Sequence, residues 1–397
     1  MSEWKKVKLG ECCEITSSKR CHASERSKEG IPFYCSKEII QLENGEEVRE
    51  SDYIPVELYE SIKHKYGAPK QGDLLLTTRG TNGIPYVYKD KDCFYFADGN
   101  LSWFKNFKTE LSVRFLYYWF KSYIGKHSID SIAKGTAQKA VPIEGLRNLE
   151  IELPTYSTQC RIATILSRYD SLIENYQKQI KLLEESAQRL YKEWFIDLRF
   201  PGHENTKIVN GVPNGWEKKS IADLGTYLNG FAFKPSDWQE RGKPIIKIKE
   251  MGNGISTDTP RNNGERVPEK YLIKSGDLLF SWSATLMVIV WTGEEGWLNQ
   301  HLFKVTPTQG IGREFLLQSI SKTIAEFSNL TTGSTMKHIQ RNKLEQVFVN
   351  TPTSEIMNSY CRIAERQREQ ILNISSQIHH LTEARDRLLP KLMSGEI

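Results

Sequence analysis

The sequence predicts two mixed α/β domains, each followed by a long helix. The two helices are expected to pair as an antiparallel coiled coil, which relates the halves by a pseudo-two-fold axis. Three observations carry this prediction: a repeated block, strand-like runs before each copy, and a helical apolar repeat after each copy. The block reads GTAQKAVPIEGLRNLEIELP at 135–154 and GSTMKHIQRNKLEQVFVNTP at 333–352. An internal repeat has to be identified before other motifs, because a repeat that is overlooked leads to the wrong fold.

The offset between the two copies separates a fixed part of each half from a variable part. From Pro154 to Pro352 the offset is 352 − 154 = 198 residues, and the helical segments that follow keep it. Upstream the offset is larger, because QGDLLLTTRG at 71–80 corresponds to SGDLLFSWSA at 275–284. We therefore predict variable domains at 1–155 and 204–352, and conserved helical spacers at 156–203 and 353–397.

Length and composition indicate an ordinary globular protein of two or three domains. The chain has 397 residues, of which 26% are charged and 11% aromatic, and its net charge is only +5. Charge alone therefore does not indicate a nucleic-acid binder, and any DNA-binding cations must be sorted onto one face. The seven cysteines include no CxxC pair, and no apolar leader or membrane-length run is present. We expect a cytoplasmic chain without a metal site.

The variable domains are expected to contain short strands and amphipathic helices. Runs rich in β-branched and aromatic residues, bounded by Gly, Asp and Asn, indicate the strands. These runs lie at 73–78, 85–89, 92–97 and 149–154 in the first half and at 244–249, 277–282, 287–291 and 346–350 in the second. A helical period indicates helices at 113–133 and 313–330.

The spacers carry apolar residues at alternating steps of three and four, which is the pattern of a coiled-coil interface. The predicted helix–helix interface consists of Ile173, Ile180, Leu183, Leu190 and Trp194, together with Ile371, Ile378, Leu381, Arg385, Leu388 and Leu392. The alternative is that each helix packs only on its own domain. Since a polar residue in such an interface fixes register at some cost in stability, we expect Arg385→Leu to stabilise the protein and to loosen partner choice.

Motifs that would indicate catalysis are missing. The sequence contains no GxxxxGK[ST], GxSxG, HExxH or GxGxxG motif, no Asn-Pro-Pro-Tyr type motif, and its histidines are scattered. We therefore predict no catalytic residue and no metal ligand, and the sequence favours a binding protein.

In its repeated blocks, its GDLL segments and its duplicated spacers, the chain resembles the specificity subunit of type I restriction-modification systems over essentially its whole length. The resemblance implies that each variable part is a target recognition domain for one half of a bipartite, asymmetric site in double-stranded DNA. It also implies that the helices join the two domains and dock two modification (methyltransferase) subunits, and that two restriction subunits join the complex for cleavage. S-adenosylmethionine, ATP and magnesium would then belong to those partners, and this chain would carry no cofactor.

Candidate DNA contacts lie in loops beside the shared blocks, where the scaffold is fixed and side chains are free to vary. In the first half they are Arg79, Thr81, Asn82, Lys134, Thr136, Gln138 and Lys139; in the second they are Ser281, Trp282, Thr285, Asn299, Gln300, His301, Thr335, Lys337 and His338. Arg and Lys can bond guanine, Asn and Gln can bond adenine, and hydroxyls mostly hold phosphates. For each residue the alternative is a turn or cap role without a ligand.

Two other functions are compatible with the sequence. A restriction or modification enzyme active by itself would bind S-adenosylmethionine as an isolated chain. A coiled-coil adaptor that binds proteins only would show no salt-dependent affinity for DNA. The target sequence itself cannot be read from the residues, because base choice depends on the placement of individual side chains.

A helical spacer predicts that the gap between the two half-sites depends on helix length. A helix of about 35 to 40 residues is roughly 55 Å long at 1.5 Å per residue. Inserting one heptad near Glu185 is therefore expected to change the preferred gap, which sequencing of methylated sites would measure. An unaltered target would refute this idea.

Overall fold

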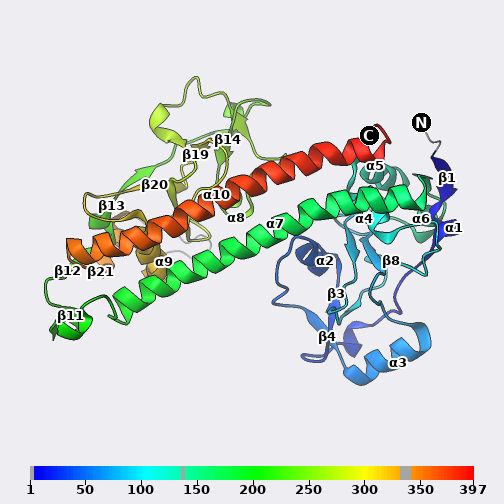
Figure 1. Ribbon diagram of the computed structural model, residues 1–397, viewed down its shortest axis with the longest axis horizontal. Coiled ribbons are helices and arrows are strands. Elements are labelled where there is room, and N and C mark those ends of the chain that lie inside the picture. Colours follow the sequence, from blue (N-terminus) through cyan, green and yellow to red (C-terminus); the bar gives the residue numbers. More distant parts are fainter. Residues whose placement is uncertain (1–3, 136–138, 331–340) are drawn as a thin grey trace. The chain divides into compact units, whose positions relative to one another are not determined.

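The computed structural model describes residues 4–135, 139–330 and 341–397, and the chain divides into two compact units (Figure 1). The first unit comprises Met1–Asn175 with His380–Ile397, and the second comprises Tyr176–His379. Two long helices, α7 (Tyr156–Tyr191) and α10 (Ser354–Met393), each contribute one end to each unit. Each unit therefore combines a variable domain with segments of both helices.

Among its described residues, the first unit contains a four-stranded sheet of order β2-β8-β5-β6, a three-stranded sheet of order β4-β3-β7, and the pair β1-β9. Neighbouring strands are antiparallel except β3 and β7, which are parallel. The strands are β1 (Lys5–Lys8), β2 (Glu14–Thr16), β3 (Ile31–Tyr34), β4 (Asp52–Ile54), β5 (Leu74–Thr77), β6 (Pro85–Val87), β7 (Tyr95–Phe96), β8 (Leu101–Lys105) and β9 (Glu150–Leu153). The helices before α7 are α1 (Leu9–Cys12), α2 (Ser36–Glu43), α3 (Val56–Tyr66), α4 (Val113–Lys121), α5 (Tyr123–Ile132) and α6 (Ile143–Arg147), with a 3₁₀ turn at Ala23–Glu25.

The described part of the second unit repeats this topology. Its sheets have the orders β13-β20-β17-β18 and β15-β14-β19-β16, with β12 paired to β21 and β10 to β11. The strands are β10 (Ile208–Val209), β11 (Val212–Pro213), β12 (Glu217–Ser220), β13 (Gly225–Asn229), β14 (Lys243–Ile246), β15 (Arg261–Asn262), β16 (Leu272–Ile273), β17 (Leu278–Ser281), β18 (Met287–Val290), β19 (Gly296–Leu298), β20 (Leu302–Pro307) and β21 (Phe348–Thr351). The α-helices before α10 are α8 (Ile248–Asn253) and α9 (Arg313–Leu330), and short 3₁₀ helices lie at His203–Asn205, Ile221–Leu224, Pro235–Asp237, Glu269–Tyr271 and Arg341–Gln346.

Each strand of the first unit has a counterpart in the second, whose described residues also form β10, β11 and β16. The order β2-β8-β5-β6 corresponds to β13-β20-β17-β18, and β4-β3-β7 corresponds to β15-β14-β19. The parallel pair recurs as well, since β14 runs parallel to β19 as β3 does to β7. The predicted duplicated α/β fold is thus confirmed, and the match assigns counterparts to residues of the paired strands.

The apolar run in β5 illustrates why these strands form the core. Leu74 and Leu76 belong to the cluster that includes Phe104 and Phe115, whereas Leu75 belongs to another cluster with Trp103. Successive side chains of a strand point to opposite faces, so a continuous apolar run fits a strand that is buried on both faces. Asp73 precedes this run and accepts hydrogen bonds from the Lys70 amide and the Trp103 indole. Burial raises the pKa of the Asp73 carboxyl, although these hydrogen bonds oppose the shift.

The helix predicted at 113–133 is wrong in one respect, because it is broken at Ser122 into α4 and α5. The Ser122 hydroxyl donates to Trp119 O at 2.6 Å and accepts from the Gly125 amide at 3.1 Å. Gly125 is required by the tight turn, since a Cβ there would lie 2.0 Å from Trp119 O. In the second half the corresponding segment forms one helix, α9, in which Ala325 stands at the position of Gly125.

The long helices run antiparallel. In the first unit, Ile162 and Leu166 near the start of α7 share a core with Leu392 and Met393 near the end of α10. In the second unit, Tyr191 at the end of α7 shares a core with Met357 and Tyr360 near the start of α10. Directly after Tyr191 the backbone forms a π-helical turn at Lys192–Ile196, which also carries two residues of that core, Trp194 and Phe195.

Every residue of the predicted helix–helix interface is at least half-buried. Ile173, Trp194, Ile371 and Leu392 are buried, and the other seven are intermediate in exposure. By contrast Leu182, which lies outside the three-four pattern, is 63% exposed.

The contacts of Arg385 change the effect on stability that is expected from leucine at that position. Its guanidinium forms an ion pair with Asp170 at 2.7 Å and another with Asp386 at 2.8 Å. Leucine would leave the Asp170 carboxylate without its cation, so we no longer expect Arg385→Leu to stabilise the protein.

Candidate nucleic-acid interface

The loop that follows β5 is closed by a buried hydroxyl. Thr77 donates through Oγ1 to Thr81 O at 2.7 Å and accepts from the Ile84 amide at 2.9 Å. The Gly83 amide also donates to Thr77 O, and Gly83 has the left-handed φ of 83° that glycine permits. This geometry holds Arg79 and Thr81 on the exposed side of a fixed turn.

A second predicted loop lies against this turn. The Val141 amide donates to Thr78 O at 2.9 Å, and Asn82 donates through Nδ2 to Lys139 O at 3.1 Å. Lys134 and Ala140 exchange two backbone hydrogen bonds of 2.8 Å at the base of this second loop. Two sequence segments that were predicted separately therefore form one surface of the first unit.

Three cations of this surface are available to an anion. Arg79, Lys134 and Lys139 are exposed, and no described carboxylate lies within ion-pair distance of any of them. Thr136 and Gln138, which were predicted to act with them, lie outside the described residues. Unpaired cations on adjoining loops suit a phosphate backbone, because they lose no internal ion pair when they bind it.

The structure also brings a segment to this surface that the sequence reasoning missed. A cavity of about 390 Å³ lies beside Thr78 and is lined in part by Lys19, Arg20, Asp98 and Ser102. The preceding residues are held here by long-range contacts, because Ser18 donates to Phe96 O at 2.7 Å. A basic SSKR tetrapeptide directly after the first half's second strand was the only sequence signal available.

Two hydroxyls line this cavity without an internal partner. Thr78 and Ser102 are 3% and 1% exposed, and no hydrogen bond joins either hydroxyl to another described residue. A hydroxyl can donate and accept, so both groups can bond a ligand that enters the cavity.

The corresponding loop of the second unit is closed in the same way. Ser281, the counterpart of Thr77, donates to Thr285 O and accepts from the Met287 amide at 2.9 Å. Its side chain is fully buried, so its role in this structure is to close the loop. Thr285 is exposed at the tip, and Trp282 follows Ser281 as Thr78 follows Thr77.

Aromatic rings occupy the second unit where the first has its cavity. The Trp282 ring lies 5.7 Å from that of His301 and 6.0 Å from that of Phe303, measured between centroids. Phe303 pairs with Phe280 as Ser102 pairs with Leu76, so ring and hydroxyl stand at matched positions. The Trp282 indole donates to Asn229 Oδ1 at 3.1 Å.

The predicted segment 299–301 divides into one structural and two accessible residues. Asn299 is 5% exposed, its amide donates to Ile246 O, and its Oδ1 accepts from the His301 amide. Gln300 and His301 are half-buried, and the His301 Nδ1 atom is buried without a partner among the described residues. Thr335, Lys337 and His338 lie outside the described residues. The DNA-contact role of all these residues stays a prediction.

The described residues show neither a metal-ligand cluster nor a membrane-spanning helix. No group of three or more His, Cys, Asp or Glu side chains there is arranged to hold a metal ion. None of the described helices is long and apolar enough to cross a bilayer.

Comparisons with known proteins agree on one family. The family model of the type I restriction modification DNA specificity domain matches residues 1–185 and 213–382. The MjaIX specificity subunit of Methanocaldococcus jannaschii is 27% identical over 348 residues, which is 82% of this chain and 78% of that protein. The HindI specificity subunit of Haemophilus influenzae is 24% identical over 65% of this chain and 71% of its own length. Among solved structures, the type I S subunit from M. genitalium aligns with a TM-score of 0.56 at 16% identity, covering 98% of this chain and 96% of that one.

Proposed function

The chain belongs to the type I restriction-modification DNA specificity family, and on this premise we propose that each of its two recognition domains reads one half of a bipartite, asymmetric DNA target. Its long helices would dock two modification subunits, and two restriction subunits would join the complex for cleavage. Methyl transfer and ATP-driven cleavage, with their S-adenosylmethionine, ATP and magnesium, would belong to those partners.

The observation that carries this proposal is one scaffold with two different surfaces. The matched loops after β5 and β17 are closed by the same hydroxyl contacts, through Thr77 and Ser281. Yet one loop is followed by an open, hydroxyl-lined cavity and the other by a cluster of rings. Equivalent scaffolds support equivalent docking on two half-sites, and unlike side chains support unlike base sequences.

Within the first domain we assign separate roles to the two loops. Arg79 is the candidate base reader, because its backbone is fixed on both sides and a guanidinium bonds guanine O6 and N7 in the major groove. Thr81, Lys134 and Lys139 are candidate phosphate contacts, and Asn82 mainly joins the loops through its bond to Lys139 O.

Within the second domain we assign base contacts to exposed or half-buried groups. Gln300 and His301 carry side-chain nitrogens 3.5 Å apart beside the Trp282 ring, and the exposed Thr285 hydroxyl suits a phosphate. Asn299 and Ser281 hold the backbone that presents these groups.

Mapping methylated adenines across a genome tests this function. Cells that express the modification subunit with this chain are expected to methylate adenine in one two-part motif, and cells without the chain are expected to lose that motif. A matched strain whose chain carries the loop 77–83 of another family member should change the first half of the motif only. Methylation that does not depend on the chain would contradict the proposal.

A further inference from the structure

The two long helices are copies of one another, yet two of their matched positions carry unlike groups. The offset of 198 residues takes Asp170 of α7 to Arg368 of α10, and Ala187 of α7 to Arg385 of α10. An anion in one copy thus becomes a cation in the other, and a small apolar residue becomes a second cation.

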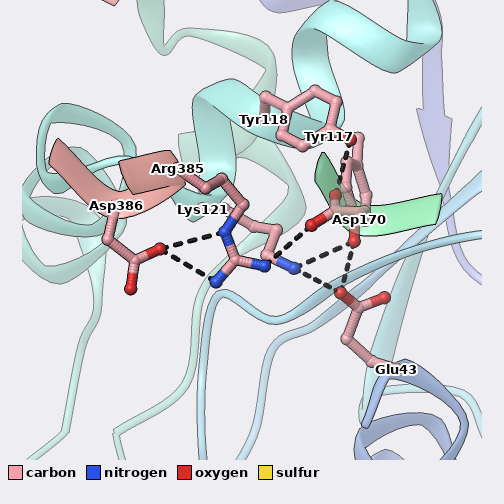
Figure 2. Close-up of polar contacts among 7 residues, drawn as sticks. All are labelled: Glu43, Tyr117, Tyr118, Lys121, Asp170, Arg385 and Asp386. Atoms are coloured by element: carbon pink, nitrogen blue, oxygen red, sulfur yellow. Dashed lines mark hydrogen bonds and ion pairs between the residues drawn. The ribbon is translucent and has the colours of Figure 1, made fainter. Parts of the chain in front are cut away.

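In the first unit these differences join α7 to α10. Arg385 Nη1 donates to Asp170 Oδ1 at 2.7 Å, and Tyr118 of α4 donates its hydroxyl to Asp170 Oδ2 at 2.6 Å (Figure 2). Burial and this hydrogen bond to Asp170 raise the pKa of the Tyr118 phenol, which keeps it a donor. Among the contacts drawn in Figure 2, the one between Asp170 and Arg385 is the one that joins the long helices.

The neighbouring cluster in Figure 2 serves the domain rather than the helix pair. Lys121 of α4 donates to Glu43 Oε1 at 2.7 Å and to the Tyr117 hydroxyl at 3.0 Å, and Tyr117 donates to the same Glu43 oxygen. These contacts join α4 to α2. They would persist whichever helix packed against α7.

In the second unit the matched positions meet differently. Gln367 of α10 donates to Ser186 Oγ of α7 at 3.0 Å, which brings the adjoining residues Arg368 and Ala187 to the same stretch of the pair. Ala187 is 2% exposed and offers no charge. Arg368 instead forms a bidentate ion pair with Glu314 of α9, at 2.8 and 3.0 Å.

These positions distinguish the native pairing from two alternatives with a second copy of the chain. If α7 packed on a second α7 in the same register, Asp170 would face Ala187 and lose its cation. If α10 packed on a second α10, Arg385 would lose Asp170 and face Arg368, whose guanidinium is already paired. In the first alternative Asp170 would keep only the Tyr118 hydroxyl, and in the second Arg385 would keep only Asp386 of its own helix. Each half-buried charge would thus lose one of its two partners, which costs more than the loss of an exposed ion pair.

We propose that Asp170 and Arg385 select the pairing of α7 with α10 and exclude pairs of identical helices from two copies. The selection favours pairs of unlike halves over pairs of identical halves. It depends on the helix contacts alone and does not require the DNA-reading function.

Nicked full-length protein allows a direct test. A protease site in the exposed turn at Asn210 and Gly211, between β10 and β11, is cut after folding, so both halves begin in the native complex. Nicked protein with and without heavy isotopes is then mixed, and native mass spectrometry identifies the pairs. Mixed-isotope pairs of first and second halves prove that exchange has occurred.

Each neutral variant is expected to allow one kind of pair between two identical halves. Wild type should reassemble as first–second pairs, Asp170→Asn should add pairs of two first halves, and Arg385→Gln should add pairs of two second halves. Arg387→Gln is the matched control, because Arg387 is exposed and pairs with Glu383 of its own helix. Identical pairs in wild type, or their absence from both Asp170→Asn and Arg385→Gln after proven exchange, would overturn the proposal.

Discussion

Replacing Glu314 with alanine is expected to lower the free energy of unfolding of the second unit by about 3–5 kcal/mol. Glu314 is 1% exposed and Arg368 is 5% exposed, and the two share a bidentate ion pair. Alanine would leave the Arg368 guanidinium buried without its carboxylate. An unpaired buried charge destabilises the protein by more than the intact ion pair stabilises it. Denaturant unfolding, with hydrogen exchange to locate the loss in the second unit, measures the effect.

The matched control is Glu365→Ala, which removes a neighbouring carboxylate with more access to water. Glu365 pairs with Arg313 at 2.6 Å, but its side chain is 34% exposed and that of Arg313 is 25% exposed. Water can replace this partner, so the expected loss is about 1 kcal/mol or less. Equal losses from Glu314→Ala and Glu365→Ala would contradict the role assigned to burial.

A double replacement separates the ion pair from the space it fills. Glu314→Leu combined with Arg368→Met substitutes apolar groups for both charges and leaves neither unpaired. Buried ion pairs replaced in this way are often no less stable, so most of the loss in Glu314→Leu alone should be recovered. If the double variant were as unstable as Glu314→Leu alone, the loss of stability would come from altered packing and not from the unpaired charge of Arg368.

The parts of the fold that could be predicted are those governed by local pattern. The apolar run at β5 and its repeat at β17 are short, bounded by turn residues and buried, so sequence reasoning found both. Helices α7 and α10 follow from the three-four repeat, which depends on residues within one helix. The duplicated order of strands follows because the same pattern occurs twice in the chain.

The parts that could not be predicted depend on contacts between distant residues. Ser18 donates a hydrogen bond to Phe96 O, 78 positions away in the sequence, and no periodic pattern in the sequence predicts that contact. Arg385 interrupts an apolar pattern, and its reason is Asp170, which lies 215 positions away. The helix breaks at Ser122 because the Ser122 hydroxyl bonds Trp119 O and the Gly125 amide. The helical periodicity of the segment gives no sign of this break.

The candidate site was predicted as individual residues in separate loops, and the sequence did not show which of these loops adjoin. Sequence reasoning proposed the segments at 79–82 and 134–139 separately, and the structure joins them through the bond from Asn82 to Lys139 O. Ser281 and Asn299 are buried within their turns, a role that residue type alone cannot distinguish from base contact. Exposure therefore directs the mutational tests toward Arg79 and Lys139.

Arg79→Ala is expected to relax base preference at one position of the first half-site and to reduce discrimination there by about 1–3 kcal/mol. The backbone around Arg79 is held on both sides, because its carbonyl accepts from Ser36 Oγ at 3.2 Å and the Thr78 amide donates to Asn100 O at 2.8 Å. A fixed backbone limits the positions that the guanidinium can reach, which suits it to one base pair. Binding of the complex with modification subunits to a randomised half-site library measures the change.

Lys139→Ala is the comparison for Arg79→Ala, because Lys139 is assigned to a phosphate and Arg79 to a base. A phosphate contact carries no base information, so its loss should weaken binding to all sequences alike and lower the slope of log affinity against log salt by about one. Arg49→Ala is the neutral comparison, because Arg49 is 84% exposed, pairs with Glu47 and belongs to neither loop. If Arg79→Ala behaved as Lys139→Ala is expected to, Arg79 would be a phosphate anchor, and the base reader of the first half would have to be sought among the groups that line the cavity beside Thr78.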